Sequence, residues 1–176
     1  MINFFHQTGD IILFKRKFNL FKPMSWIALI IRIITKAKYN HAGVILVENN
    51  QIFLVESWTK GIRKLPFYER NFKDVEFTTF RPNYWNFDKL VFKEEIKLLL
   101  KKKYDYKATI IEQFLYYTFG IWTGAKNEEQ AKKRLFCYEL VWHLHRKSDT
   151  FGIWGKWWKC KLNDIITDKY KNFKEI

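Results

Sequence analysis

Cysteine is scarce in this chain. Only Cys137 and Cys160 occur among 176 residues, accompanied by four histidines. These residues do not have the short, regular spacing of a zinc site. The two thiols could pair only in an oxidising compartment, and nothing in the sequence favours one. The sequence therefore predicts neither a structural metal nor another cofactor.

Glycine and proline are also few, with seven and three residues. No glycine-rich loop is present that could cradle a phosphate, and no dinucleotide-binding fingerprint occurs. No stretch rich in proline, glycine and serine marks a linker, and no internal repeat is visible. The length is enough for one domain with a sizeable core, so we expect a single domain over residues 1–176.

Long hydrophobic runs are missing. The most apolar run, residues 26–34, is too short to span a bilayer and contains Arg32. Residues 1–7 lack the basic start and apolar core of a signal peptide. A cytoplasmic location is the default expectation.

Acidic residues are outnumbered, with 18 Asp and Glu against 32 Lys and Arg, which gives a formal net charge of +14. Such an excess attracts nucleic acid, anionic lipid or an acidic substrate. The densest basic clusters, residues 101–103 and 132–134, are more typical of solvated helix faces. No helix-turn-helix, zinc-finger or RNA-binding signature accompanies them, which argues against nucleic acid. Aromatic residues make up 19% of the chain, so some rings should line a cleft or lie on the surface.

Apolar periodicity and turn signals predict a sheet in the first half of the chain and helices mainly in the second. Pro23 and Ser25 signal the start of an early helix, whose apolar residues on both faces suggest burial on two sides. We interpret the strands as an antiparallel meander. The predicted strands are residues 11–14, 39–47, 51–57, 62–67 and 75–80, and the predicted helices are residues 25–36, 87–103 and 108–119.

Cys137 is the first candidate for chemistry. It precedes Leu140, Val141 and Leu144, which recur at helical spacing, so it should lie near the N-terminus of a buried helix. The free backbone N–H groups and the helix dipole at that end favour a thiolate, the nucleophilic form of cysteine. The alternative is that Cys137 is a small buried hydrophobic residue.

A nucleophilic cysteine needs a base, usually histidine. His143 and His145 follow Cys137 on the same helix and face away from it and from each other, so we interpret both as polar surface residues. His6 lies in a terminus that we expect to be loose. Glu94 and Glu95 are interpreted as exposed helix charges, as is the pair Glu128-Glu129.

His41 is better placed, because it opens a strand and is followed by the small residues Ala42 and Gly43. Small neighbours would allow a helix N-terminus to approach the sheet closely. A turn at Asn49-Asn50 would bring the next strand back, with Glu56 near the same end of the hairpin. A carboxylate among apolar strand residues is costly to bury unpaired, and His41 would pair with it. The alternatives are an incidental histidine and a solvent-facing glutamate.

A known family has these features in this order. The chain resembles the circularly permuted branch of the NlpC-type papain-like superfamily, the YiiX-like proteins, and more distantly the lecithin retinol acyltransferase family. The resemblance extends from about residue 9 to residue 165. It is carried by Gly9-Asp10-Ile11-Ile12-Leu13-Phe14, Trp26-Ile27, Asn40-His41-Ala42-Gly43-Val44, Val55-Glu56-Ser57 and Phe136-Cys137-Tyr138-Glu139-Leu140-Val141.

The resemblance implies an α+β fold, in which an antiparallel sheet or half-barrel packs against helices, as in a permuted papain-like domain. It implies that Cys137 is the nucleophile, His41 the base and Glu56 the third member of the triad. Tyr104 matches a tyrosine upstream of the cysteine, for which we expect a role on the substrate or oxyanion side. Tyr138 stands where the family often has serine and would place a ring at the mouth of the site.

The leading function is therefore a cysteine-dependent hydrolase of amide or peptide bonds that uses a Cys137, His41 and Glu56 triad. An alternative is a lipid acyltransferase, thioesterase or phospholipase-like enzyme acting at an anionic membrane surface, which agrees with the charge and the many rings. A third reading is a non-catalytic basic module that binds nucleic acid. The expected substrate is a small molecule, a peptide or a lipid acyl group, and no pattern specifies an oligomeric state.

Overall fold

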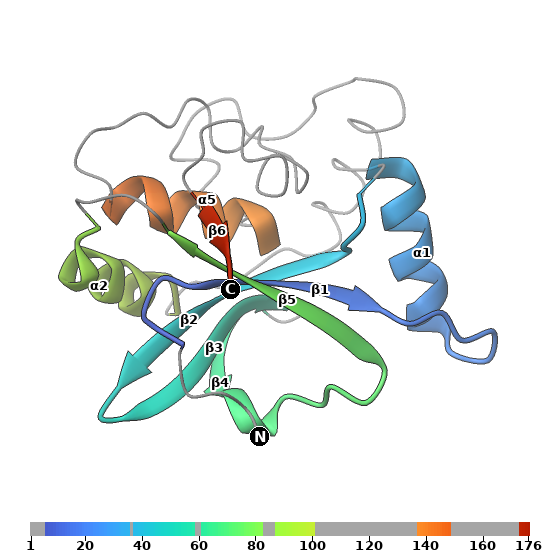
Figure 1. Ribbon diagram of the computed structural model, residues 1–176, viewed down its shortest axis with the longest axis horizontal. Helices are drawn as coiled ribbons and strands as arrows, with labels where there is room; N and C mark the ends of the chain where they lie inside the picture. Colours follow the sequence, from blue (N-terminus) through green and yellow to red (C-terminus); the bar gives the residue numbers. More distant parts are fainter. Residues whose placement is uncertain (1–5, 36, 59–60, 83–86, 101–136, 149–172) are drawn as a thin grey trace.

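The computed structural model describes residues 6–35, 37–58, 61–82, 87–100, 137–148 and 173–176 (Figure 1). Its centre is an antiparallel sheet of six strands in the order β4-β3-β2-β1-β5-β6. The predicted α+β fold is confirmed. The strands are β1 (Ile11–Arg16), β2 (His41–Glu48), β3 (Gln51–Trp58), β4 (Gly61–Pro66), β5 (Val75–Pro82) and β6 (Phe173–Glu175). The helices are α1 (Pro23–Thr35), the short 3-10 helix η1 (Phe67–Glu69), α2 (Lys89–Leu100) and α5 (Cys137–Ser148).

The strand order corrects the predicted meander. Strands β2, β3 and β4 do follow one another as neighbours, but β5 pairs with β1, with Ile11 opposite Phe80. Because β1 pairs with β2 on its other edge, it becomes an inner strand of the sheet. Residues 11–14 of β1 are apolar and fully buried, and a strand buried on both faces is most stable when its backbone is paired on both edges.

Alternate residues of the strands build two separate apolar clusters. One face of the sheet, with Leu13 and Val44, is covered by α2 and α5, as Figure 1 shows. The other face, with Ile12 and Ile45, packs against Phe67 of η1. The strict alternation follows from the two-residue period of a strand. The site described below lies at the end of the sheet where β2 begins.

The turn between β2 and β3 fixes the register of this hairpin. Asn49 and Asn50 both have positive φ, 49° and 59°. Such a two-residue turn matches the twist of the strands and leaves Glu48 opposite Gln51. The register then continues to Gly43 opposite Glu56, which settles a point that the sequence left open.

The prediction that α1 is buried on two sides is wrong. Ser25 and Ala28 are buried, but Trp26, Ile30 and Ile33 are exposed. Burial in the core therefore does not explain why this side of α1 is apolar. None of the described helices is both long and apolar enough to cross a membrane.

Candidate active site

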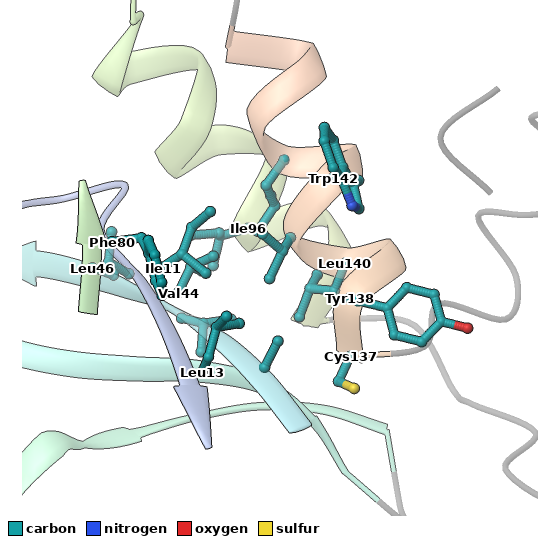
Figure 2. Close-up of a cluster of buried hydrophobic side chains, with 14 of the residues drawn as sticks. Ile11, Leu13, Val44, Leu46, Phe80, Ile96, Cys137, Tyr138, Leu140 and Trp142 are labelled. Atoms are coloured by element: carbon teal, nitrogen blue, oxygen red, sulfur yellow. The ribbon is translucent and has the colours of Figure 1, made fainter. Parts of the chain in front are cut away.

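Cys137 is the first residue of α5, as its sequence context predicts. Its side chain is buried at the border of the apolar cluster between the sheet and α5 (Figure 2). At this end of the helix, backbone N–H groups have no partner within the helix and the helix dipole is positive. The position therefore favours a negative charge on the sulfur or on a group bound next to it.

His41 is the first residue of β2 and contacts the other two predicted site residues. Its Nε2 donates a hydrogen bond to Oε2 of Glu56 at 2.7 Å, and its ring also hydrogen-bonds Cys137. Since Glu56 holds Nε2, the nitrogen left for the sulfur is Nδ1. The structure thus brings Cys137, His41 and Glu56 together in one row, with the imidazole in the middle.

Gly43 makes room for this row in a way that the sequence interpretation did not foresee. A Cβ at Gly43 would lie 2.8 Å from Cδ1 of Leu54, 3.0 Å from the carbonyl oxygen of Val55 and 3.3 Å from Cβ of Glu56. The lack of a side chain at Gly43 therefore allows the close approach of β3 and not that of a helix N-terminus, so the reason given for Gly43 from the sequence is wrong. Ala42 does face the apolar cluster that contains Cys137, so the reason holds for that residue.

Rings enclose the imidazole on two sides. Phe14 stacks on His41 with ring centroids 5.6 Å apart, and Trp58 meets it edge to face at 5.9 Å. Phe14 is the direct partner of His41 between β1 and β2. These contacts cover most of the imidazole, whose side chain is 14% exposed, and hold it between its two polar neighbours. Electrostatic interactions are stronger in such a mostly buried place than in water.

The electrostatics of the row favour a protonated imidazole. Burial acts to lower the pKa of His41, but the negative charge and hydrogen bond of Cys137, and then those of Glu56, raise it from 6.5 to about 9. Burial acts to raise the pKa of Glu56, but His41, Arg70 and Arg63 lower it from 4.5 to about 2. Glu56 is therefore ionised and His41 charged across the neutral pH range.

Two arginines that the sequence interpretation missed complete the site. Arg63 lies directly opposite Glu56 on β4 and donates to its Oε1 from Nε at 2.9 Å and from a terminal nitrogen. Arg70 follows η1 and approaches the same oxygen at 3.6 Å. Both guanidinium groups lie over the ring of Trp58, at 4.1 Å and 5.3 Å from its centroid. Glu56 thus binds His41 through Oε2 and the two arginines through Oε1.

The comparisons with known proteins support this architecture at the level of the fold. The chain resembles a solved structure described as metalloprotein yiiX from Escherichia coli O157:H7, with a TM-score of 0.54 and 18% identity. The fold is shared. The match covers 81% of this chain and 66% of the other, slightly less than two thirds of the length of that protein. No family model and no curated protein matches the sequence.

The description of that neighbour as a metalloprotein raises the question of a metal here. Within the described ranges, no three His, Cys, Asp or Glu side chains converge on a point that could hold an ion. Cys137 and Glu56 lie on different sides of the His41 ring, so they do not face a common centre. The donor set at this site therefore does not fit a metal ion.

Of the other residues predicted for the site, the structure describes Tyr138 but not Tyr104. Tyr138 follows Cys137 in α5 and is buried, with its ring pointing away from the strands in Figure 2. Its place at the mouth of the site stays a prediction. Tyr104 and Cys160 lie outside the described residues, as do the predicted helix over residues 108–119 and the basic clusters.

The interpretation of His143 and His145 as surface residues is wrong, because both are fully buried. His143 pairs through Nε2 with Oε1 of Glu95 on α2 at 2.6 Å, so Glu95 is not the exposed helix charge that we expected. His145 lies between the rings of Phe87 and Phe92. Helix-face reasoning placed these residues relative to Cys137, whereas packing against α2 decides their burial.

His6 is likewise not in a loose terminus. Its Nδ1 lies 3.7 Å from Oδ2 of Asp10, and its ring meets Phe67 edge to face at 5.2 Å. Asp10 is fully buried and accepts two hydrogen bonds of 2.9 Å from Arg81. This pair joins the residues before β1 to β5 and holds the inner strand in place.

The buried His145 predicts a loss of stability in acid. Burial lowers its pKa from 6.5 to about 3, although Asp10 and a hydrogen bond with the Gly9 backbone act to raise it. The unfolded chain therefore binds a proton below pH 6.5 that the folded protein does not, and stability falls as the pH drops from 6.5 towards 3. In a His145→Gln variant, the slope of unfolding free energy against pH should fall by about 1.4 kcal/mol per pH unit between pH 6 and 5.

Urea unfolding at a series of pH values measures this slope. The raised pKa of His41 does not interfere, because the stability that His41 contributes is complete below 6.5 and is lost only between 6.5 and about 9. An unchanged slope in the variant would show that His145 can take up a proton in the folded protein.

Proposed function

We propose that this protein is a thiol-dependent hydrolase that cleaves amide or peptide bonds through Cys137, His41 and Glu56. The observation that supports it best is the row of three side chains in which a buried, ionised Glu56 holds an imidazole next to a cysteine at a helix N-terminus. A cysteine that is only a small core residue would not need a charged partner. Burying His41 and Glu56 costs free energy unless the two side chains pair with each other.

The proposed reaction starts from a thiolate and an imidazolium. Sγ of Cys137 attacks the carbonyl carbon, a sulfur–carbon bond forms, and the electron pair of the carbonyl moves onto its oxygen. Backbone N–H groups at the start of α5 stabilise that oxyanion, an interaction typically worth about 3 kcal/mol. The intermediate collapses to a thioester, and the leaving amine departs with the proton that His41 donates.

Water completes the cycle. It attacks the thioester carbon while His41 accepts its proton, the carbon–sulfur bond breaks, and the acid is released. General acid–base action of this kind contributes roughly 10²–10⁴-fold. Glu56 keeps the same ring nitrogen facing the sulfur in both halves of the cycle and stabilises the imidazolium, as a third member does in cysteine and serine hydrolases.

Alkylation of Cys137 by iodoacetamide tests the first step. At about pH 6 an ordinary thiol, with a pKa of about 8.5, is almost fully protonated and reacts slowly. In a Cys160→Ser background only Cys137 reports, and we expect it to react at least about tenfold faster than the same chain unfolded in urea. His41→Ala should remove that advantage, because it removes the cation that holds the thiolate.

The matched control is Lys64→Ala, which removes a cation from β4 next to Arg63 but pairs with Glu48 instead of Glu56. It should leave the alkylation rate unchanged. A native Cys137 that reacts no faster than the unfolded chain would refute the proposed nucleophile, as would a His41→Ala variant that reacts at the native rate.

The substrate could instead be a lipid acyl ester, with the same attack on a carbonyl carbon. The observation that favours this second candidate is the exposed apolar surface of α1 together with the exposed lysines that flank this helix in the sequence, Lys17 and Lys38. The segment lies between the end of β1 and the start of β2, where His41 lies. Turnover of a phospholipid in mixed micelles, compared with turnover of a peptide amide, distinguishes the two candidates.

A further inference from the structure

Six large apolar side chains on α1 and the loop before it are turned to solvent. We call these residues the apolar ridge. Their exposed fractions are 46% for Phe18, 61% for Leu20, 89% for Phe21, 43% for Trp26, 49% for Ile30 and 66% for Ile33. Scattered exposed apolar residues are ordinary, but a contiguous set marks a surface that meets another apolar phase.

The helical part of the ridge is a single stripe. Trp26, Ile30 and Ile33 recur at the spacing i, i+4 and i+7, which places them on one face of α1. Ser25 and Ala28 are buried on the opposite face. The exposed stripe is therefore a regular feature of the helix, on the side away from its buried residues Ser25 and Ala28.

The loop part of the ridge is held in place by hydrogen bonds. Trp26 donates from Nε1 to the carbonyl oxygen of Leu20 at 3.0 Å, and its ring meets Phe18 edge to face at 5.0 Å. The backbone N–H of Asn19 donates to the hydroxyl of Ser25 at 3.1 Å. The rings of this loop are thus fixed on the outside of the protein, and little entropy is lost when they bind a partner.

The same segment carries much of the positive charge. Residues 15–38 contain seven Lys and Arg residues and no Asp or Glu. This segment therefore contributes +7, half of the formal net charge of +14. Two of these cations pair with acidic residues near β5, Lys15 with Glu76 and Lys22 with Asp74. Lys17 and Lys38 are exposed. Lys17 directly precedes Phe18 of the ridge in the sequence, and Lys38 follows the C-terminal end of α1 by three residues.

We propose that the apolar ridge docks this protein on the surface of an anionic lipid membrane. An amphipathic helix with tryptophan on its apolar face and cations beside it can lie in the headgroup region, with the rings inserted and the cations on lipid phosphates. With 13 residues, α1 is too short to span the bilayer, so it would lie parallel to the surface.

The charge argues for lipid over two other partners. A second copy of the chain would bring two strongly basic segments face to face, which costs free energy. Nucleic acid would satisfy the cations, but it would leave the apolar ridge in water, since phosphate contacts dominate such binding. An anionic bilayer offers both a negative surface and an apolar phase within a few ångströms of each other.

The ridge is attached to the end of the sheet that carries His41. The backbone N–H of Asn40 donates to the carbonyl oxygen of Phe14 at 2.9 Å, and the backbone N–H of Arg16 donates to Oδ1 of Asn40 at 2.8 Å. The chain thus leaves and re-enters the sheet at one place, next to the candidate site. Docking needs no chemistry at Cys137, so this inference stands apart from the proposed hydrolase activity.

Co-sedimentation with vesicles of phosphatidylcholine, with and without phosphatidylserine, tests the docking. The wild-type protein should bind only the vesicles with phosphatidylserine, and high salt should release it. A Phe21→Ser, Ile33→Ser double variant should partition at least about tenfold more weakly. A Lys17→Glu, Lys38→Glu variant should lose at least about fivefold for each cation removed.

The matched control is Leu90→Ser with Leu98→Ser, which removes two exposed apolar residues from α2. It should bind as the wild type does, and so should Cys137→Ala, which separates docking from catalysis. All variants change exposed side chains or a single sulfur, and thermal unfolding checks that each is folded. The charge variant keeps the test valid if the ridge variant is unstable.

Three results would overturn the proposal. The wild-type protein could fail to bind anionic vesicles, or the ridge variant could bind as tightly as the α2 control. Light scattering could instead show a wild-type dimer that the ridge variant converts to a monomer, without vesicle binding by either. The ridge would then be an interface between two copies of the chain.

Discussion

Replacing Cys137 by alanine should lower turnover of a reactive p-nitrophenyl ester and of a peptide p-nitroanilide by at least about 10³-fold. The proposed reaction has no other nucleophile, because the thioester forms on this sulfur. His41, Glu56 and the N-terminus of α5 would remain in place, so any residual rate comes from the oxyanion site and binding alone. The measurement is the initial rate per enzyme molecule at saturating substrate.

The fold should survive this change. Cys137 lies at the border of the apolar cluster, and losing one sulfur atom should change the free energy of unfolding by about 1 kcal/mol. Ser148→Ala is the matched control, since it also removes one heteroatom from α5, at the other end of the helix. A Cys137→Ala variant that keeps its turnover, or a Ser148→Ala variant that loses as much, would refute the assigned role.

The sequence predicted local structure well, for identifiable reasons. The expected strands over residues 51–57 and 75–80 match β3 and β5 within two residues, because apolar patterning and turn residues act locally. The proximity of His41 and Glu56 follows from the Asn49-Asn50 turn, which ties both residues to one end of a short hairpin. The helix beginning at Cys137 follows from the apolar spacing behind it.

What the sequence could not predict depends on contacts between distant elements. Arg63 meets Glu56 only because the register of β3 and β4 places them opposite each other, and no local pattern fixes that register. The signal that the sequence did offer is a basic residue, Arg63, inside a short predicted strand that follows the strand of Glu56. His143 is buried only because α2 presents Glu95 to it.

The error on α1 has a different cause. Apolar residues on several faces of a helix usually indicate burial, and the interpretation followed that rule. In this protein Trp26, Ile30 and Ile33 on one side of α1 are exposed, although the stripe that they form is apolar. The rule that apolar residues indicate burial therefore mispredicted this side of α1, whose proposed partner is a membrane and not the protein core.

Glu56→Gln should shift the alkaline limb of the profile of kcat/KM against pH to lower pH. Catalysis by the ion pair needs a protonated His41, whose pKa of about 9 is raised by the negative charge and hydrogen bond of Cys137 and then of Glu56. A neutral amide keeps the shape of the side chain but loses the charge, so the pKa of His41 should fall towards its ordinary value of about 6.5. Turnover above neutral pH should decrease accordingly.

The same change should also destabilise the protein, by about 3–5 kcal/mol, because His41, Arg63 and Arg70 lose the buried anion that compensates their charge. The folded pKa of Glu56, about 2, lies below its unfolded value of 4.5, so its stabilising effect is complete above pH 4.5 and is lost as the pH falls towards 2. The variant should therefore be less stable at neutral pH and show less additional loss in acid.

Glu48→Gln is the matched control for both effects, since Glu48 lies in the same hairpin and pairs with Lys64, away from His41. It should leave the alkaline limb in place and cost about 1 kcal/mol or less. If Glu56→Gln kept the wild-type alkaline limb, the imidazole would not depend on Glu56, and the buried carboxylate would serve only the two arginines. A shift of the limb with little loss of stability would instead mean that water reaches Arg63 and Arg70 and replaces the lost charge.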